Sequence, residues 1–164
     1  MILPIVTPRR LTRVSATALL IGSLTAACSL LSSNAAFAGM AMMAAAQTAN
    51  AGLDGCSSNS GKALYDCVAN VLDRMSNEIT DRGASQTRSA LHDAATQLHA
   101  AVNNAQALSA IAQCRALISG ALAKVRALGG GYVEGWGGGS GHGVGLEAVA
   151  NVLGRAAKLI QAKG

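Results

Sequence analysis

The distribution of proline is the feature that most constrains how this chain can fold. Both prolines, Pro4 and Pro8, lie at the amino-terminal end, and the 156 residues that follow contain none. Proline interrupts helices and is common in turns, so a long proline-free sequence favours helices punctuated by glycine. The chain is 51% hydrophobic but only 2% aromatic, which predicts a core of Ala, Leu, Val and Ile. We therefore expect an all-α protein with closely packed helices.

Residues 1–38 have the pattern of a secretory signal peptide. A basic segment ends at Arg13, an uncharged apolar run follows from Val14 to Leu31, and small residues stand at Ala36 and Ala38. This order of features predicts export and cleavage after Ala38. The apolar run is close to the length that spans a bilayer, so an uncleaved anchor is the alternative.

Two other kinds of leader share features with this segment. The stretch LTAAC at residues 24–28 resembles a bacterial lipoprotein box, which would make Cys28 an acylated first residue. That box usually has an aliphatic residue where Thr25 stands. The pair Arg9-Arg10 resembles a twin-arginine signal but lacks the apolar residues that should follow it. Ordinary cleavage stays the prediction, with the lipoprotein as an alternative.

Removal of the leader leaves a nearly neutral chain of 126 residues, a size that suits one domain. The whole sequence has 13 Lys and Arg residues against eight Asp and Glu, a formal charge of +5, and three of the cations are in the leader. The remaining charge divides into −2 over residues 39–93 and +4 over residues 94–164. This mild asymmetry predicts no nucleic-acid partner.

Hydrophobic periodicity divides the exported chain into segments. Residues 39–60 are predicted to form an N-terminal arm rich in Ala, Met and Ser: we expect a short helix or a loose segment over 39–51 and a loop over 52–61. The helical domain is predicted over residues 61–128. It begins with an amphipathic helix at 61–82, where apolar residues recur at spacings of three and four. Ser60 has the position of its N-cap and Gly83 the position just beyond its end.

Two further apolar stripes cover residues 85–102 and 104–128. Asn103 and Asn104 are poor helix formers, and Asn103 with Gln106 has the spacing of a capping box. We predict a helical hairpin broken at these asparagines, because folding back covers both stripes. The apolar register continues through the asparagines, so one long helix is the alternative.

Residues 129–145 contain ten glycines and are predicted to form a loop, because such a backbone loses much entropy in a helix. An apolar stripe over residues 146–164 then predicts an amphipathic C-terminal helix. The stripes together suggest a bundle of three to four helices. The outer side of the last helix carries Arg155, Lys158 and Lys163, so binding to an anionic membrane surface is an alternative use of it.

Export changes the meaning of the cysteines that follow the leader, Cys56, Cys67 and Cys114, because an oxidising compartment favours disulfides. In an up-down-up arrangement, Cys67 and Cys114 come to similar heights on apolar helix faces. We therefore predict a Cys67–Cys114 disulfide, with the two pairings of Cys56 as alternatives. The odd cysteine, Cys56, would then be available for a bond to a second copy.

Few residues offer catalytic or metal-binding chemistry. The glycine-rich stretch lacks the strand, turn and complete motif of a nucleotide-binding loop. A set of Cys114, His92 or His99, and Asp93 is present in the sequence, but a buried cysteine and two solvated histidines explain these residues more simply. Three methionines within residues 40–43 would suit Cu(I), although they also suit plain apolar packing. We predict no enzyme activity, no metal and no cofactor.

Protein–protein interaction is the function that remains. Tyr132 and Trp136 lie in the glycine-rich loop, and large amphipathic side chains are enriched at binding hot spots. A ring tucked onto the bundle is the alternative role. We predict an exported, non-enzymatic helical protein, periplasmic or secreted, that binds an envelope or extracellular protein or assembles with itself.

Overall fold

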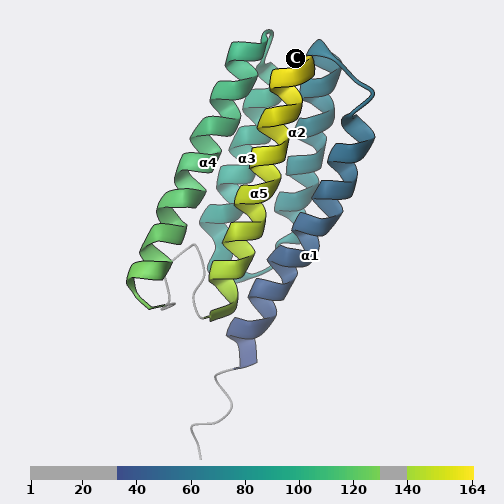
Figure 1. Cartoon of the computed structure of the whole chain (residues 1–164). Helices are drawn as coiled ribbons and strands as arrows, with labels where there is room; N and C mark the ends of the chain where they lie inside the picture. The colour runs from purple at the N-terminus through teal and green to yellow at the C-terminus, as the bar shows by residue number, and fades with distance from the viewer. Residues whose placement is uncertain (1–32, 130–139) are drawn as a thin grey trace, which may run out of the picture.

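The computed structural model describes residues 33–129 and 140–164, which form a bundle of five α-helices and one short 3₁₀ turn (Figure 1). The helices are α1 Ser33–Cys56, α2 Gly61–Glu78, α3 Ser85–Ala100, α4 Asn104–Ala127 and α5 Ser140–Lys163, and the turn is η1 Arg82–Ala84. The prediction of an all-α fold is confirmed. The number of helices is larger than the three to four predicted, because the segment before residue 61 contributes a helix of its own.

The helices run alternately up and down, and α5 closes the bundle (Figure 1). Each of the first four packs on the next, and α5 lies between α4 and α1 with a smaller contact to α2. Because the number of helices in this ring is odd, α1 and α5 run in the same direction. Their contact joins residues as far apart in the sequence as Asn50 and Arg155, which are 105 positions apart.

The Ala- and Met-rich segment is an integral part of the bundle rather than a loose arm. Residues 39–56 lie in α1, so the helical alternative is the one observed. One side of α1 is buried, and it consists of Met42, Ala45, Ala46, Ala49, Leu53 and Cys56. Their spacing of three and four residues forms one stripe, which packs on α5 and α2.

The connection between α2 and α3 differs in detail from the prediction. α2 ends at Glu78, four residues early, and Ile79 rather than Gly83 follows its last turn. The Gly83 N–H donates to the Asp81 side chain at 2.9 Å, so this glycine belongs to η1 instead of the helix end. At the start of α2, Ser60 occupies the N-cap position, but its side chain makes no capping hydrogen bond.

The predicted break at the asparagines is confirmed. α3 ends at Ala100 and α4 begins at Asn104, so the two stripes form a hairpin rather than one long helix. The Gln106 backbone N–H donates to the Asn103 side chain at 2.9 Å, and the Val102 N–H donates to the Gln106 side chain at 2.9 Å. These two bonds satisfy donors that the start of a helix leaves without partners.

α5 begins at Ser140, six residues before the predicted start at 146, and its first turns include several glycines. The packing of this segment against α1 offsets the conformational entropy that its glycines lose in a helix. A Cβ at Gly145 would lie 2.9 Å from the Met42 Cβ and 3.2 Å from the Gly39 carbonyl oxygen. The absence of a side chain at Gly145 therefore lets α1 and α5 approach closely.

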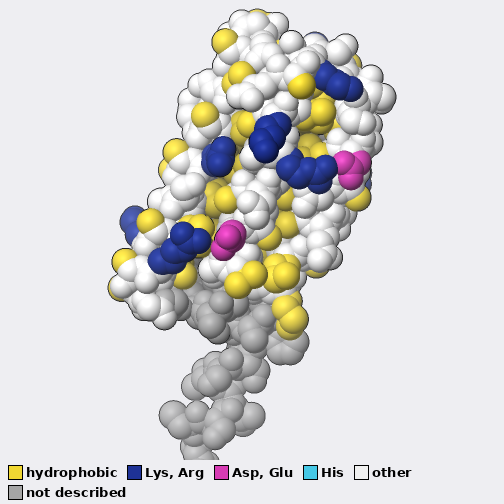
Figure 2. Space-filling model, in the orientation of Figure 1, with side chains coloured by type: hydrophobic (Ala, Val, Ile, Leu, Met, Phe, Trp, Pro, Cys, Tyr) yellow, Lys and Arg dark blue, Asp and Glu magenta, His cyan; other side chains and the backbone are white. Residues whose placement is uncertain are grey.

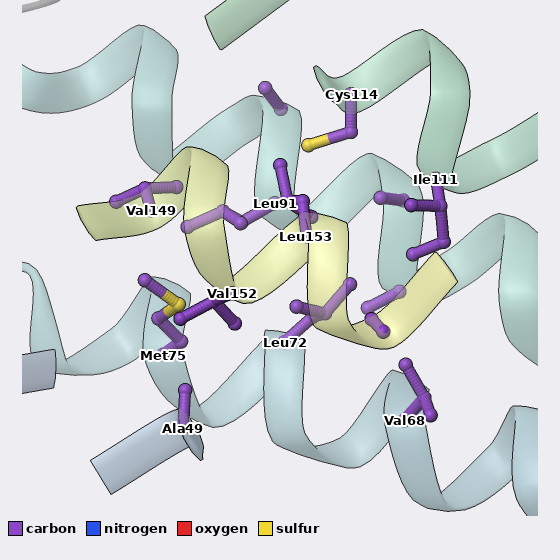
Figure 3. Close-up of a cluster of buried hydrophobic side chains, with 14 of the residues drawn as sticks. Ala49, Val68, Leu72, Met75, Leu91, Ile111, Cys114, Val149, Val152 and Leu153 are labelled. Atoms are coloured by element: carbon purple, nitrogen blue, oxygen red, sulfur yellow. The ribbon is translucent and has the colours of Figure 1, made fainter. Parts of the chain in front are cut away.

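The core lies along the inner side of α5 (Figure 3). Val152 and Leu153 of α5 lie among side chains from α2, α3 and α4. The largest fully buried side chains of the described residues are Met42, Leu64, Leu72, Met75, Ile79, Leu91, Leu98, Ile111, Ile118, Leu146, Leu153 and Ile160. These side chains are all aliphatic or Met, as the scarcity of aromatic residues predicts.

One helix in the described part of the chain, α4, is long and apolar enough to cross a membrane by length and composition. In the bundle one stripe of it is buried against α3 and α5. This stripe consists of Ala107, Ala110, Ile111, Cys114, Ile118, Ala121 and Val125. Part of the apolar character of α4 therefore serves the core.

Candidate functional site

The two predicted interaction residues, Tyr132 and Trp136, lie outside the described residues. Leu128 and Gly129 follow α4, and α5 begins at Ser140. Both flanks are at the same end of the bundle, the lower end in Figure 1. The hot-spot role of Tyr132 and Trp136 stays a prediction.

The predicted Cys67–Cys114 disulfide is wrong. Cys67 is bonded to Cys56, with 5.7 Å between the two Cα atoms, and Cys114 is a free, buried thiol. Figure 3 shows the Cys114 side chain directed into the buried cluster. Similar heights along two helices bring two cysteines together only if both side chains also point toward each other around the helix axes. Because Cys56 is in an intrachain bond, it is not available to link two copies.

Cys114 is a packing residue rather than a nucleophile. Burial, and after it the charge of Asp93, raises the pKa of the thiol to about 12, so the thiol is protonated at neutral pH. The thiolate is the reactive form of cysteine. His92 and His99 each contact a carboxylate of α2 instead. In the described part of the chain no hydrogen bond joins Cys114 to either histidine, so the Cys–His–Asp set that the sequence contains has no support from the contacts.

The two histidines of α3 form a matched pair of polar links to α2. His92 Nδ1 lies 2.8 Å from Asp73 Oδ1, and His99 Nδ1 lies 3.1 Å from Asp66 Oδ1. Lys62 pairs with the same carboxylate of Asp66, and its hydrogen bond is the main cause of the lowered pKa of Asp66. The five side chains are 41% to 64% exposed, so these links contribute little to stability. We assign them to the alignment of α3 along α2.

The sequence contains a signal for these links in the equal spacing of two acids and two histidines. Asp66 and Asp73 are seven residues apart on one helix, and His92 and His99 are seven residues apart on the next. In an antiparallel hairpin, equal spacing brings the first member of one pair opposite the last member of the other. Complementary residues at equal spacing on adjacent helices therefore indicate paired contacts.

The three methionines of residues 40–43 lie in two different environments. Met42 is fully buried, whereas Met40 and Met43 are 56% and 38% exposed. Sulfur ligands on opposite sides of a helix do not converge on one ion. Among residues 33–129 and 140–164, no group of three or more His, Cys, Asp and Glu side chains is placed to hold a metal ion.

Lys and Arg gather on the side of the bundle formed by α4, α5 and the adjoining part of α1, which we call the α4–α5 face (Figure 2). The described residues of these three helices include six cations and two acids, a charge of +4. They are Arg115, Lys124, Arg126, Arg155, Lys158 and Lys163 against Asp54 and Glu147. By contrast, residues 61–100 carry four cations and five acids, a charge of −1.

Two of these cations fasten α5 to α1. Arg155 donates to the Asn50 side chain at 2.8 Å and to the Asp54 carboxylate at 2.7 Å. Beyond the end of α1, the Lys163 ammonium donates to the Ser57 carbonyl. Both sets of contacts hold the C-terminal part of α5 against the C-terminal end of α1.

Other cations on the face differ in whether they have a partner. Arg126 lies 3.5 Å from the Glu147 carboxylate, across α4 and α5. Arg115 and Lys124 on α4 and Lys158 on α5 make no ion pair or hydrogen bond with any described residue. These three charges are therefore not used by the fold.

Two shallow grooves run beside α5 on this face. The groove between α4 and α5 has a volume of about 420 Å³ and is lined by Leu108, Ile111, Ala112, Arg115, Ala116, Ser119, Ala157 and Gln161. The groove between α1 and α5 has a volume of about 380 Å³ and is lined by Leu53, Asp54, Ser57, Arg155, Lys158, Leu159 and Ala162. Each groove combines apolar side chains with a cation that has no partner in the fold, Arg115 in the first and Lys158 in the second.

The apolar stripe of the C-terminal helix belongs to the core. Its members Leu146, Val149, Val152, Leu153, Ala156 and Ile160 are fully buried. A membrane-active helix needs such a stripe at the lipid surface. To act in that way α5 would have to leave the bundle, so its burial counts against the membrane-active alternative.

Comparison with known proteins gives no relative: no family model, no curated protein and no solved structure matches this chain.

Proposed function

We propose that this chain is an exported, non-enzymatic helical protein that binds an acidic protein partner through its α4–α5 face. The separation of charge carries the proposal, because the described residues of α1, α4 and α5 sum to +4 while the α2–α3 hairpin sums to −1. A surface of one sign steers an oppositely charged partner and selects against others.

The grooves beside α5 support the same proposal. Protein interfaces combine an apolar centre with a polar rim. The α4–α5 groove has this composition, with Ile111 and Ala157 as apolar members and Arg115 as its cation. Lys158 has the corresponding place in the groove between α1 and α5. A partner that presents carboxylates would pair with Arg115 and Lys158 without displacing any contact of the fold.

The proposal includes export. Residues 1–38 would act as a signal peptide that is cleaved after Ala38, and the mature protein would work in the periplasm or outside the cell. The Cys56–Cys67 disulfide supports an oxidising compartment, since such bonds are rare in the cytosol. Mass spectrometry of protein taken from the periplasm should find Gly39 as its first residue. A retained leader, or a lipid on Cys28, would contradict this part of the proposal.

Photo-crosslinking in exporting bacterial cells tests the binding face. A photoreactive residue in place of Gln161, which lines the α4–α5 groove, should give a discrete adduct with an acidic envelope or extracellular protein. The same residue in place of Thr96, on the exposed side of α3, serves as the matched position and should give none.

Charge reversal then separates specific binding from chance contact. The double variant Arg115→Glu, Lys158→Glu should lower the yield of the adduct by about tenfold or more, as loss of two interfacial ion pairs would. Arg74→Glu, an exposed arginine of α2, is the control and should leave the yield unchanged. All variants should unfold at the same temperature as the parent protein. Equal adducts from both crosslinking positions, or an adduct that survives the reversal, would refute the proposal.

A further inference from the structure

A separate polar groove lies between the end of α2 and the first half of α3, away from the α4–α5 face. It has a volume of about 350 Å³, and its lining includes Asn77 of α2 and Ser85, Arg88, Ser89, His92 and Asp93 of α3. Where the grooves beside α5 are mainly apolar, the side chains here are hydrogen-bonding or charged. We call it the α2–α3 groove.

The donors of this groove come from one side of α3. Ser85, Arg88, Ser89 and His92 follow the spacing i, i+3, i+4 and i+7, which places side chains on the same helix face over two turns. Two hydroxyls, a guanidinium and an imidazole therefore lie along a single line beside α2.

Arg88 is the group that the fold leaves without a partner. It makes no ion pair or hydrogen bond with any described residue, and its Nε is buried. A buried donor without an acceptor costs free energy that a bound acceptor would recover. The guanidinium fits oxyanions best, because it donates two parallel N–H groups to neighbouring oxygens.

His92 has one ring nitrogen committed and one remaining. Its Nδ1 lies 2.8 Å from Asp73 Oδ1, and Asn77 Nδ2 lies 3.5 Å from the other oxygen of that carboxylate. Asp73 thus orients the imidazole and leaves Nε2 as the nitrogen that a ligand can contact. Asp73 is hydrogen-bonded to His92 and Asn77 and does not line the groove, so Asp93 is the acid in the lining that opposes an anion.

We propose that the α2–α3 groove binds a tetrahedral oxyanion of the phosphate class, with Arg88 as the main contact. The hydroxyls of Ser85 and Ser89 would donate to its remaining oxygens, and Nε2 of His92 would do so in the protonated form of the ring. A tetrahedral group accepts hydrogen bonds in several directions, which suits donors spread over two helical turns better than a planar carboxylate does. The proposal is independent of the partner of the α4–α5 face.

An NMR titration of the isotope-labelled protein with inorganic phosphate, at constant ionic strength, tests the site. Saturable shifts are expected at the amides of Ser85 and Ser89. Arg88→Gln should weaken binding by about tenfold or more, as removal of a bidentate charged contact does. The control Arg74→Gln removes the same charge from the exposed side of α2 and should change nothing.

Asp93→Asn supplies a test in the opposite direction. Removal of this carboxylate should tighten phosphate binding several-fold, and this gain keeps the proposal open to refutation if Arg88→Gln fails to fold. Shifts that do not saturate, equal losses in both arginine variants, or no gain in Asp93→Asn would each refute the site.

Two further ligands identify the chemistry and its source. Acetate should bind more weakly than phosphate, and equal affinity would overturn the preference for a tetrahedral group. Glycerol 3-phosphate probes the phosphate of a larger molecule, and tighter binding than inorganic phosphate would assign the site to a phosphomonoester. Weaker binding would assign it to the free ion.

Discussion

The α2–α3 hairpin and the α4–α5 face differ in the charges that they leave without a partner. In the hairpin, Asp66 contacts Lys62 and His99, and Asp73 contacts His92, and the charges left unpaired are of both signs: Arg74, Glu78, Arg88 and Asp93. On the α4–α5 face the described charges without an ion pair or hydrogen bond are all cations: Arg115, Lys124 and Lys158. The number and sign of the unpaired charges therefore say more about function than the net charge does. An exposed ion pair adds little stability, whereas an unpaired charge remains available to a partner.

α1 connects these two regions by different means. It is joined to the hairpin by the Cys56–Cys67 disulfide and to α5 by the close approach at Gly145. The hairpin side therefore has a covalent link, and the α5 side depends on packing and on the contacts of Arg155. Removal of each link in turn shows how strongly each region depends on α1.

Loss of the disulfide should have the largest effect. The double variant Cys56→Ala, Cys67→Ala removes a cross-link between residues 11 positions apart, which costs about 3 kcal/mol of unfolding free energy in the chain-entropy model. Urea denaturation of the mature chain measures it. Cys114→Ala is the control, because it removes a buried sulfur without opening a ring. A thiol assay of the denatured, unreduced protein should count one free thiol, and a count of three would contradict the bond.

Two glycines of α5 should respond with opposite signs to the same substitution. Gly145→Ala places a methyl 2.9 Å from the Met42 Cβ and should destabilise the protein by about 1–3 kcal/mol through overpacking. A Cβ at Gly154 meets nothing within 4 Å, so Gly154→Ala should stabilise the helix by up to about 1 kcal/mol. Thermal unfolding of the two variants measures the difference. Equal changes would mean that α1 and α5 are not in close contact.

The sequence predicted the parts of the fold that have strong local patterns. In the helix predicted over residues 61–82, apolar residues recur at spacings of three and four and polar residues occupy the other side. At the break, the capping residue Asn103 and its partner Gln106 lie within four positions of each other. The fold class and the hairpin follow from such patterns, and both are confirmed. Local chemistry is sufficient wherever an element is defined by its own neighbours in the chain.

The parts that the sequence did not predict depend on contacts between distant segments. α1 is built from small residues on every side, so its buried stripe gives little contrast with its exposed side. The early start of α5 depends on Gly39 and Met42, about 100 residues away in the chain. The disulfide partner of Cys67 is decided by the direction of each cysteine around its helix, which spacing along the helix does not give.

The unused charges of the candidate site were equally beyond prediction. The sequence indicates Arg155, Lys158 and Lys163 as cations of one helix side, but only their contacts separate Lys158 from the other two. Arg115 and Arg88 attract no notice in the sequence, because each stands among apolar or polar residues without a motif. A charge without an intramolecular partner can be identified only from a structure that gives the positions of all the groups it could pair with.

The smallest effect is expected from the polar links of the hairpin, and it tests whether its charges are truly satisfied. The pKa of Asp66 lies below its ordinary value, first because of the hydrogen bond from Lys62. A carboxyl whose pKa is lowered by folding contributes stability that is present above its unfolded pKa and is lost as the pH falls through the folded value. Lys62→Gln should therefore raise the pKa of Asp66 in an NMR titration and lower the free energy of unfolding slightly at neutral pH, and this difference should vanish as the pH falls through the folded pKa.

The control for this experiment is Lys124→Gln on α4, which removes a cation from the opposite region and should leave the titration of Asp66 unchanged. At neutral pH the cost of Lys62→Gln should stay below about 1 kcal/mol, because exposed ion pairs contribute little. A larger cost would assign the hairpin charges a part in holding the fold. An unchanged Asp66 would mean that Lys62, like Lys158, is free for a partner, and the contrast between the two regions would disappear.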